Sequence, residues 1–396
     1  MTEPPRQRPS AFSVIIKPHG AVCNLRCDYC YFLKKKDLYQ AGVPIISDET
    51  LEVFTRQYIE SQLTSEVTFV WQGGEPTLPG LDFYRKALFL QAKYARPGQK
   101  IRNAIQTNAT LLDEAWCAFF HAHDFLVGVS LDGPRRFHDD FRHDAQGGSV
   151  FERVIKGVEL LKEHAVAFNV LCCVHQRNAP YPLDVYRFLR DELGAQFIQF
   201  IPIVERMNDT GYQQGYQLTG RSVGSLQYGQ FLNAVFDEWI RADVGKVFVQ
   251  IFDCTLAGWL GEDPALCLFE PECGLALELE PNGDVYSCDH FVEPHYLLGN
   301  IHQAHLVELA GSPQQAAFGQ NKRNSLPEYC RECEFLFLCH GGCPKNRIRR
   351  TPQGSEGLNY LCAGYKAFFA HVERPMQRMA RLVRSGQPAA GIINRT

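Results

Sequence analysis

The chain has 396 residues, with 40 lysines and arginines against 44 aspartates and glutamates, and a formal net charge of −4. This length allows about two to three domains. The acidic balance argues against nucleic-acid binding by charge alone, and no stretch approaches the roughly 18 apolar residues of a membrane span. We expect a cytoplasmic protein without nucleic-acid or membrane partners, in which residues 1–11 are disordered.

From residue 12 to about 203, short apolar runs alternate with longer segments of helical periodicity, the pattern of βα units around a parallel sheet. Strands are predicted at 12–17, 67–71, 101–107, 125–131, 167–174 and 197–203. Helices are predicted between them at 48–62, 81–95, 112–122, 150–164 and 182–193. The fold class is therefore α/β, and active-site groups are expected on the loops that follow the strand ends.

The ends of the first four predicted strands carry unusual residues. The first strand is followed by CNLRCDYCYF, residues 23–32, and the second by QGGEP, residues 72–76. Asn108 follows the third strand, and the fourth runs into SLDGP from Ser130. Two adjacent glycines after a buried strand let the backbone approach a ligand closely, although GGEP alone is equally typical of a tight turn.

Beyond about residue 240 the alternation stops, and cysteines, glycines and hairpin signals take over. The PNG at 281–283 predicts a tight turn between two short strands, the second ending at Cys288. We place a boundary at 236–250, which gives a first domain of residues 12–240 and a cysteine-rich second domain of residues 241–396.

The chain has 15 cysteines. In a reducing compartment such a number indicates metal binding or catalysis and not disulfides. Cys23, Cys27 and Cys30 form a C-x3-C-x2-C triplet without a nearby fourth ligand at zinc spacing. An iron–sulfur cube held by three thiolates leaves one iron open to another ligand. A zinc knuckle or three free thiols are the alternatives.

Eight further cysteines lie in the second domain, and their spacing permits either two four-cysteine zinc sites or two closed clusters. They are Cys267, Cys273, Cys288, Cys330, Cys333, Cys339, Cys343 and Cys362. Four cysteines remain, at 117, 172, 173 and 254. The first three stand in apolar patterns, which predicts ordinary buried residues.

The triplet, with an aromatic residue before its third cysteine, resembles the signature of the radical S-adenosylmethionine (SAM) superfamily. The resemblance implies a partial (β/α)6 barrel and a [4Fe–4S] cluster on the triplet, whose open iron binds SAM and cleaves it to a 5′-deoxyadenosyl radical. It also implies SAM contacts from Gln72, Gly73, Gly74, Glu75, Asn108, Ser130 and Arg153. One departure is the alanine after Asn108, where glycine is commoner, and we expect it to matter little.

The order of the later cysteines resembles the SPASM extension of peptide-modifying radical SAM enzymes, which implies two auxiliary [4Fe–4S] clusters. The first would be held by Cys267, Cys273, Cys288 and Cys343, and the second by Cys330, Cys333, Cys339 and Cys362. The stretches WQGGEPTL, QFIPI and GDVYSCDHFVEPHYLLGNI resemble, in particular, the anaerobic sulfatase-maturating enzymes, and this resemblance covers residues 12–365.

This family resemblance implies that a cysteine or serine of a sulfatase, in a Cys/Ser-x-Pro-x-Arg motif, is oxidised to Cα-formylglycine. The electron source would be a low-potential donor such as a flavodoxin or ferredoxin. Asp289 matches the family's catalytic base, since the substrate thiol or hydroxyl must lose a proton as its second electron leaves. Two alternatives stay open: a related enzyme that forms a thioether or other crosslink in a ribosomal peptide, and a non-enzymatic metal-binding or electron-carrier protein.

Overall fold

The computed structural model describes residue 9, residues 11–39, residue 42 and residues 44–395. The predicted disordered segment 1–11 therefore lies, apart from residues 9 and 11, outside the described residues. Among the described residues, no helix is both long enough and apolar enough to cross a membrane.

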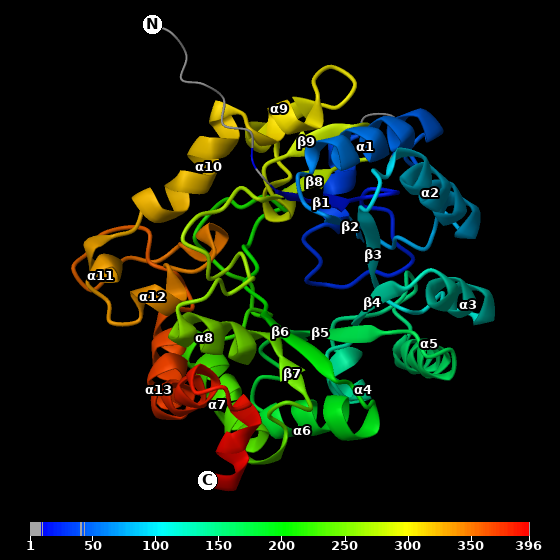
Figure 1. Ribbon diagram of the computed structural model, residues 1–396. Helices are drawn as coiled ribbons and strands as arrows, with labels where there is room; N and C mark the ends of the chain where they lie inside the picture. Colours follow the sequence, from blue (N-terminus) through cyan, green and yellow to red (C-terminus); the bar gives the residue numbers. More distant parts are fainter. Residues whose placement is uncertain (1–8, 10, 40–41, 43, 396) are drawn as a thin grey trace, which may run out of the picture.

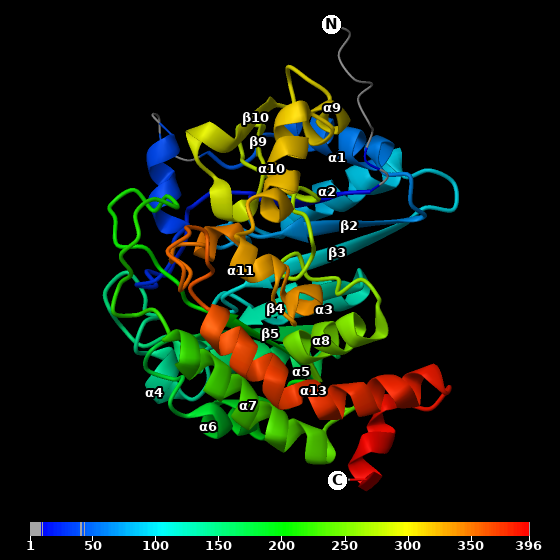
Figure 2. The ribbon, with the colours of Figure 1, turned by 90° about the vertical axis from the view of Figure 1, so that its left-hand side faces the viewer.

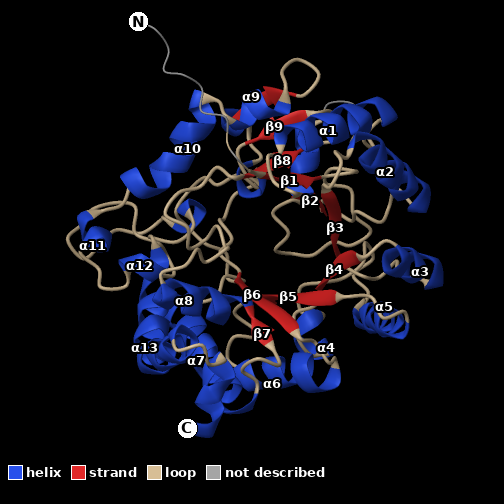
Figure 3. Cartoon of the chain, viewed as in Figure 1, coloured by secondary structure: helices blue, strands red, loops and turns tan. Residues whose placement is uncertain are grey.

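One ten-stranded sheet runs through the molecule in the order β10-β9-β8-β1-β2-β3-β4-β5-β6-β7. Its parallel part comprises β8 (Ala276–Leu279), β1 (Ser13–Ile16), β2 (Glu66–Trp71), β3 (Lys100–Thr107), β4 (Phe125–Ser130), β5 (Phe168–Val174), β6 (Phe197–Pro202) and β7 (Phe248–Val249). Antiparallel β9 (Asp284–Tyr286) and β10 (Leu297–Asn300) complete it. The sheet curves into an open barrel with helices outside it (Figure 3).

The α/β prediction is confirmed, and all six predicted strands are present with ends that differ by at most one residue. The predicted helices correspond to α1 (Asp48–Ser61), α2 (Leu81–Tyr94), α3 (Glu114–Ala122), α5 (Phe151–Glu163) and α6 (Pro182–Arg187), the last continued by a π-helical turn at Phe188–Glu192. Side-chain caps define two of the starts, because Ser47 accepts the N–H of Thr50 and Asp113 that of Trp116.

The core lies between the sheet and its outer helices. Val14 and Ile16 of β1 are fully buried, while the alternate residues of the strand face the inside of the barrel and are partly exposed. On β2, the ring of Phe69 meets that of Phe54 on α1, and the ring of Trp71 meets that of Tyr84 on α2. The outer helices therefore fix the strands and leave their carboxyl ends free to carry polar groups.

The remaining helices were not predicted. They are α4 (Arg135–His138), α7 (Ser225–Ala242), α8 (Gln250–Leu260), α9 (Leu306–Ala310), α10 (Pro313–Asn324), α11 (Glu328–Arg331), α12 (Leu336–Cys339) and α13 (Cys362–Arg384). The longest, α13, packs against α7 and α8 (Figure 2). A Cβ placed on Gly229 of α7 would lie 2.5 Å from the carbonyl oxygen of Gly364 on α13, so the two backbones touch.

The predicted hairpin around PNG is present, with β8 and β9 antiparallel and Gly283 in the left-handed region at φ +88°. The returning strand ends at Tyr286, two residues before Cys288. Strand β8 also pairs in parallel with β1, Ser13 opposite Ala276. The cysteine-rich half therefore lies directly beside the first barrel strand (Figure 1), and the sheet continues across the boundary proposed near residue 240.

Candidate active site

The loops after β1 and β2 are joined by backbone hydrogen bonds. The N–H of Gly74 donates to the carbonyl of Gly20 at 2.8 Å, and the N–H of Glu75 to that of Val22 at 2.9 Å. A Cβ on Gly74 would lie 2.0 Å from the Val22 carbonyl oxygen. At Gly74, the close backbone approach that the glycine pair predicts is therefore made by the protein's own cysteine loop, residues 17–32. Gly73 needs glycine for its φ of +140°.

Glu75 is buried, and its carboxylate is bonded by its own chain. One oxygen accepts the hydroxyls of Thr77 and Thr107, each at 2.7 Å, and the other accepts the N–H of Asn108 at 2.9 Å. Burial raises the pKa of Glu75, although these donors act in the opposite direction. The side chain thus ties the end of β2 to the end of β3. Gln72, partly exposed, donates its N–H to the carbonyl of Ile16 at 2.9 Å, where β1 and β2 end.

Asn108 connects the end of β3 to the cysteine loop. Its Nδ2 donates to Oδ1 of Asn24 at 2.9 Å and lies 3.8 Å from Sγ of Cys23. The next residue, Ala109, is buried at φ +60°, a conformation that costs an L-residue about 1–2 kcal/mol. The alanine that we expected to matter little therefore strains the backbone where the commoner glycine would not.

Ser130 and Arg153 lie around the same opening. The Oγ of Ser130, at the end of β4, accepts a hydrogen bond from Nε2 of Gln106 at 2.9 Å. Arg153 on α5 is half exposed, and its guanidinium lies 3.0 Å from Oδ2 of Asp144. Asp144 in turn forms a backbone bridge with Leu25 of the cysteine loop. Arg153 therefore reaches the loop through Asp144, whereas Asn108 approaches it directly and Ser130 is tied to β3 through Gln106.

The three thiols of the cysteine loop act on one another. Burial is the main cause that raises the pKa of Cys23 to about 12, and the negative charges of Cys30 and Cys27 add to it. In the opposite direction, the N–H of Leu25 lies 3.3 Å from Sγ of Cys23, and backbone N–H groups also point at the sulfur of Cys30. Three thiols with amide donors directed at their sulfurs fit an iron–sulfur cluster that leaves one iron open.

Asp289 is held between the two halves of the chain. It opens a short 3-10 turn directly after Cys288 and is only 13% exposed. Lys17, which follows β1, forms an ion pair with Oδ1, and the hydroxyl of Tyr31 in the cysteine loop donates to Oδ2. Burial would raise the pKa of Asp289, but the charges of Lys17 and His290 and the two hydrogen bonds outweigh it and lower that pKa. Asp289 is therefore an ionised carboxylate fixed by two barrel residues.

Lys17 is itself buried, and its ammonium lies 4.3 Å from the ring centre of Phe32. Burial would lower the pKa of Lys17, yet the carboxylates of Asp289 and Glu278 reverse this and raise it. Neither Lys17 nor Tyr31 was singled out from the sequence. Their signals were a charged residue at the end of a buried strand and a tyrosine directly after Cys30.

The predicted first quartet is brought together by the structure. Burial is the main cause of the raised pKa of Cys267, Cys273 and Cys288, and the charge of Cys343 also raises each of the three. Lys322 is buried beside them and donates to the carbonyl oxygen of Cys267 at 2.7 Å. The charges of Cys273, Cys343 and Cys267 act on this ammonium, which would offset the negative charge that these thiols carry as metal ligands.

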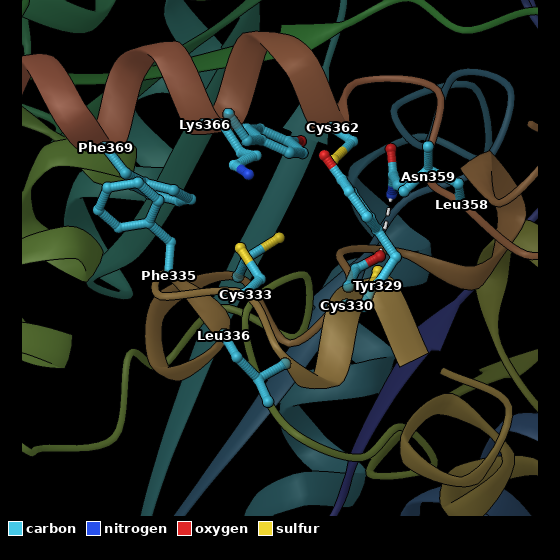
Figure 4. A pocket seen from close by; sticks show the side chains of 13 residues that line it. Tyr329, Cys330, Cys333, Phe335, Leu336, Leu358, Asn359, Cys362, Lys366 and Phe369 are labelled. Carbon is cyan, nitrogen blue, oxygen red and sulfur yellow. Dashed lines mark hydrogen bonds between the residues drawn. The ribbon is translucent and has the colours of Figure 1, made fainter. Parts of the chain in front are cut away.

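The predicted second quartet lines one cavity (Figure 4). Its members are Cys330, Cys333, Cys339 and Cys362. Burial is the main cause that raises the pKa of Cys339 and of Cys362. The charges of Cys330 and Cys333 also raise both pKa values. The rest of the lining is mostly aromatic and aliphatic, from Tyr329, Phe335, Leu336, Leu358, Tyr365 and Phe369. Such a dry shell suits a closed cluster whose four irons all have protein ligands.

Two observations concern the cysteines and the other side chains of a kind that can bind metal. All fifteen cysteines are free in this structure. Cys117, Cys172 and Cys254 are buried, whereas Cys173, predicted to be buried, is partly exposed. Within the part of the chain that the structure describes, no three His, Cys, Asp or Glu side chains gather around a single metal ion. A four-iron cube is wider than one ion, and its ligands stand correspondingly further apart.

Comparison with known families gives two matches. The Radical SAM superfamily matches residues 18–189, and SPASM, described as an iron-sulfur cluster-binding domain, matches residues 269–334. The first range holds the cysteine loop and the ends of β2 to β4. The second range begins after Cys267 and ends just after Cys333.

Relatives cover nearly the whole chain. A "Serine-type anaerobic sulfatase-maturating enzyme" of Bacteroides thetaiotaomicron is 49% identical over 392 residues, 96% of this chain and 94% of that protein. A protein of the same name from Klebsiella aerogenes is 36% identical over 376 residues, 94% of this chain and 88% of that protein. A "Cysteine-type anaerobic sulfatase-maturating enzyme" of Clostridium perfringens is 33% identical over 362 residues, 91% of this chain and 95% of that protein.

Solved structures agree with these relatives. "Native anSMEcpe with bound AdoMet", where AdoMet is SAM, superposes with a TM-score of 0.84 at 32% identity, covering 93% of this chain and 99% of that one. The same protein "with bound AdoMet and Cp18Cys peptide" gives a TM-score of 0.83 over 94% of this chain and 99% of that chain. SuiB of Streptococcus suis, at 16% identity and a TM-score of 0.61 over 88% of this chain and 76% of that one, shares the fold.

Proposed function

The chain belongs to the family of anaerobic sulfatase-maturating enzymes, and we propose that it oxidises a serine or cysteine side chain of a sulfatase to Cα-formylglycine. The two relatives of highest identity described above carry the serine-type name, which favours a serine substrate. A ribosomal-peptide crosslinking enzyme is less well supported, because the relatives described above that span nearly the whole chain carry the sulfatase-maturating name. An electron carrier without catalysis does not agree with the family.

We assign the metal-binding cysteines as the sequence predicted. Cys23, Cys27 and Cys30 would hold the SAM-binding [4Fe–4S] cluster, the quartet of 267, 273, 288 and 343 the first auxiliary cluster, and the quartet of 330, 333, 339 and 362 the second. SAM would be contacted by Gln72, Gly73, Gly74, Glu75, Asn108, Ser130 and Arg153. When bound, SAM and these clusters supply an oxidant that removes a hydrogen atom and accept a second electron.

In this proposal the chain's own base is Asp289. The substrate side chain loses a hydrogen atom from Cβ, one further electron and the proton of its hydroxyl or thiol. A carboxylate oxygen of Asp289 accepts that proton. Serine gives the aldehyde directly, whereas cysteine gives a thioaldehyde that water hydrolyses to the aldehyde with release of sulfide. Lys17 and Tyr31 hold the carboxylate in one orientation and keep it ionised beforehand. Its low pKa makes it a weak base, so it takes the proton only as the departing electron makes the substrate group more acidic.

The partners follow from the same chemistry. The substrate would be an extended sulfatase segment with a Cys/Ser-x-Pro-x-Arg motif, because its proline disfavours a helix around the target residue. The electrons that start each turnover would come from a low-potential flavodoxin or ferredoxin. We place the reaction in the cytoplasm, where free thiols persist. Residues 12–240 would form the radical SAM barrel and residues 241–396 the SPASM region.

The observation that carries this proposal is the position of Asp289. The residue after Cys288 is fixed by Lys17 at the end of β1 and by Tyr31 of the cysteine loop, so a base stands between the triplet and the first quartet. The substrate carbon and its heteroatom can thus lose a hydrogen atom near the triplet, a proton to Asp289 and an electron near the first quartet.

The test uses the reconstituted enzyme under anaerobic conditions. Peptides of about 15 to 20 residues with the Ser or the Cys form of the motif are incubated with SAM and a strong reductant, and aldehyde is trapped with a hydrazine reagent. Deuterium at the target Cβ should appear in 5′-deoxyadenosine, with the Ser peptide reacting faster. SAM cleavage without deuterium transfer from either peptide would remove sulfatase maturation and favour another peptide modification.

A further inference from the structure

A short segment after β4 is bound along the cysteine loop. The N–H of Arg26 donates to the carbonyl of His143 at 2.8 Å, and the N–H of Asp28 to that of Phe141 at 2.9 Å. Together with the bridge between Leu25 and Asp144, these bonds place residues 141–144 antiparallel to residues 25–28. These backbone bonds, together with the contact between Nε2 of His143 and Oδ1 of Asp28 at 3.0 Å, brace the cysteine loop, and none of them involves the side chain of residue 142.

That side chain, Arg142, points into the protein and is fixed there. It is 9% exposed, and its Nε and Nη2 donate to the two carboxylate oxygens of Asp132 at 2.8 and 3.2 Å. Asp132 is fully buried and also accepts the hydroxyl of Tyr29 and the N–H of Cys173, the latter at 2.9 Å. Arg142 therefore has one orientation, set by a forked carboxylate pair.

The fixed guanidinium lies beside the thiols of the cysteine loop. Burial raises the pKa of Cys27 to about 11, and the charge and hydrogen bonding of Arg142 act against burial. The same charge acts on Cys30. The Nη2 of Arg142 is also 3.7 Å from Sγ of Cys173, which belongs to β5. In the pairing of residues 141–144 with residues 25–28, Arg142 stands directly opposite Cys27. The guanidinium thus faces one edge of the triplet, and its effect on Cys27 exceeds the opposing effect of the Asp132 carboxylate.

Folding alone does not account for this charge. A buried ion pair is often no more stabilising than apolar side chains of the same volume, since both charges must leave water. The backbone bonds of residues 141–144 would also survive the loss of the guanidinium. The cation is explained if the thiols beside it carry negative charge that changes during the reaction.

We propose that Arg142, anchored by Asp132, is a positioning residue that raises the reduction potential of the cluster on Cys23, Cys27 and Cys30. The proposal rests on the assignment of that cluster under the proposed function. A cluster becomes more negative when it gains an electron, so a nearby cation stabilises the reduced form more than the oxidised form. Hydrogen bonds to cluster sulfurs act in the same direction.

The test is a redox titration of the reconstituted protein followed by electron paramagnetic resonance. The triplet cluster is identified as the signal that changes when SAM is added. Arg142→Met should shift this signal to a more negative potential and leave the auxiliary signals in place. Arg177→Met is the matched control, because Arg177 is 65% exposed and pairs with Asp140 at 3.3 Å nearby. Its titration should match the wild type.

A second variant distinguishes the loss of the charge from a folding defect. Arg142→Met combined with Asp132→Asn removes both charges and should show a negative shift that is smaller than that of Arg142→Met alone, with full iron content. An unchanged potential in both variants, or loss of the SAM-responsive cluster from both, overturns the proposal and leaves Arg142 a structural role. Absence of any SAM-responsive cluster in the wild type contradicts the proposed function instead. A shifted potential in an enzyme that oxidises no sulfatase peptide would leave this inference standing.

Discussion

The cysteine loop and the second quartet present the same donor atom in opposite surroundings. The loop thiols lie among polar groups supplied by several strand ends, with Asn108, Lys17 and Arg142 close by. The quartet thiols line a cavity whose other walls are mostly aromatic and aliphatic. Three ligands in a polar opening suit a cluster that exchanges ligands and charge, whereas four ligands in an apolar shell suit one that only passes electrons.

The first quartet is connected to the cysteine loop through the residue that follows one of its cysteines. Cys288 belongs to it, while the next residue, Asp289, is held by Lys17 and Tyr31 of the barrel. Function therefore follows from ligand number and from the polarity of the shell, not from the presence of cysteine as such. Each of the following predictions tests one side of this contrast.

The largest effect should come from the open triplet. The wild-type protein should carry about twelve irons, about four per cube. Cys27→Ala should lose about four of them together with all SAM cleavage, whereas Cys333→Ala should lose about four and still cleave SAM. Iron and sulfide analysis with quantification of 5′-deoxyadenosine checks both variants. Stoichiometric zinc in place of the auxiliary clusters would contradict the assignment of two auxiliary iron–sulfur clusters.

The next effect concerns the base between the two regions. Asp289→Asn should lower aldehyde formation by about 10²- to 10⁴-fold, because the proton acceptor is lost while the clusters and SAM are untouched. Reductive SAM cleavage should stay near the wild-type rate. Asp284→Asn, on the same hairpin and hydrogen-bonded to Asn282, is the control and should change little. Parallel losses of aldehyde and SAM cleavage in Asp289→Asn would point to a structural role.

A smaller, pH-dependent effect should follow from removal of Lys17. With Lys17 present, the pKa of Asp289 lies below its ordinary value, so the carboxylate is ionised at neutral pH. The pair then stabilises the fold above the unfolded pKa of about 3.9, and this contribution is lost as the pH falls through the lower folded value. In Lys17→Met burial raises the pKa, and aldehyde formation should fall about 10-fold between pH 8 and 6.

The pH–rate profile of aldehyde formation measures this change, and Lys17→Arg, which keeps the positive charge, is the control. A Lys17→Met profile that matches the wild type throughout would show that the barrel does not control the base. Lys17 would then hold Asp289 in place without setting its pKa.

The smallest effect tests the polar opening alone. Ala109→Gly should raise the free energy of unfolding by about 0.5–1 kcal/mol, since glycine tolerates the left-handed backbone at φ +60°. Gly157→Ala should have the opposite sign, because a Cβ there would lie 2.4 Å from the Ala109 carbonyl oxygen. Denaturant unfolding of the cluster-free protein compares the two. A loss of stability in Ala109→Gly would mean that the backbone is not strained there.

Sequence reasoning succeeded where the signal is local. The periodicity of residues 12–203 predicted six strands and their order along the chain, and the family resemblance of the cysteine motifs implied groups of thiols that the structure brings together. The turn at Gly283 was likewise visible in three consecutive residues. In each case the physical cause lies within a few positions of the chain.

It failed where the cause is distant. Lys17 and Asp289 are 272 residues apart, and no periodicity links them. The close approach of Gly74 to the Val22 carbonyl is likewise invisible in the sequence, because the two residues are about 50 positions apart. Arg142 stands in the polar run DDFRHD, and nothing in that run shows that its side chain is buried beside the cysteine loop.

The pairing of β8 with β1 has a consequence for folding during translation. Ser13 and Leu275, hydrogen-bonded at this seam, are 262 residues apart. At about 5–20 residues per second, roughly 10–50 s of translation separate them. During that interval the edge of β1 that later pairs with β8 is exposed, and the cysteine loop lacks its contact with Asp289. Chaperones and cluster-assembly factors would therefore meet the triplet as part of an unfinished sheet.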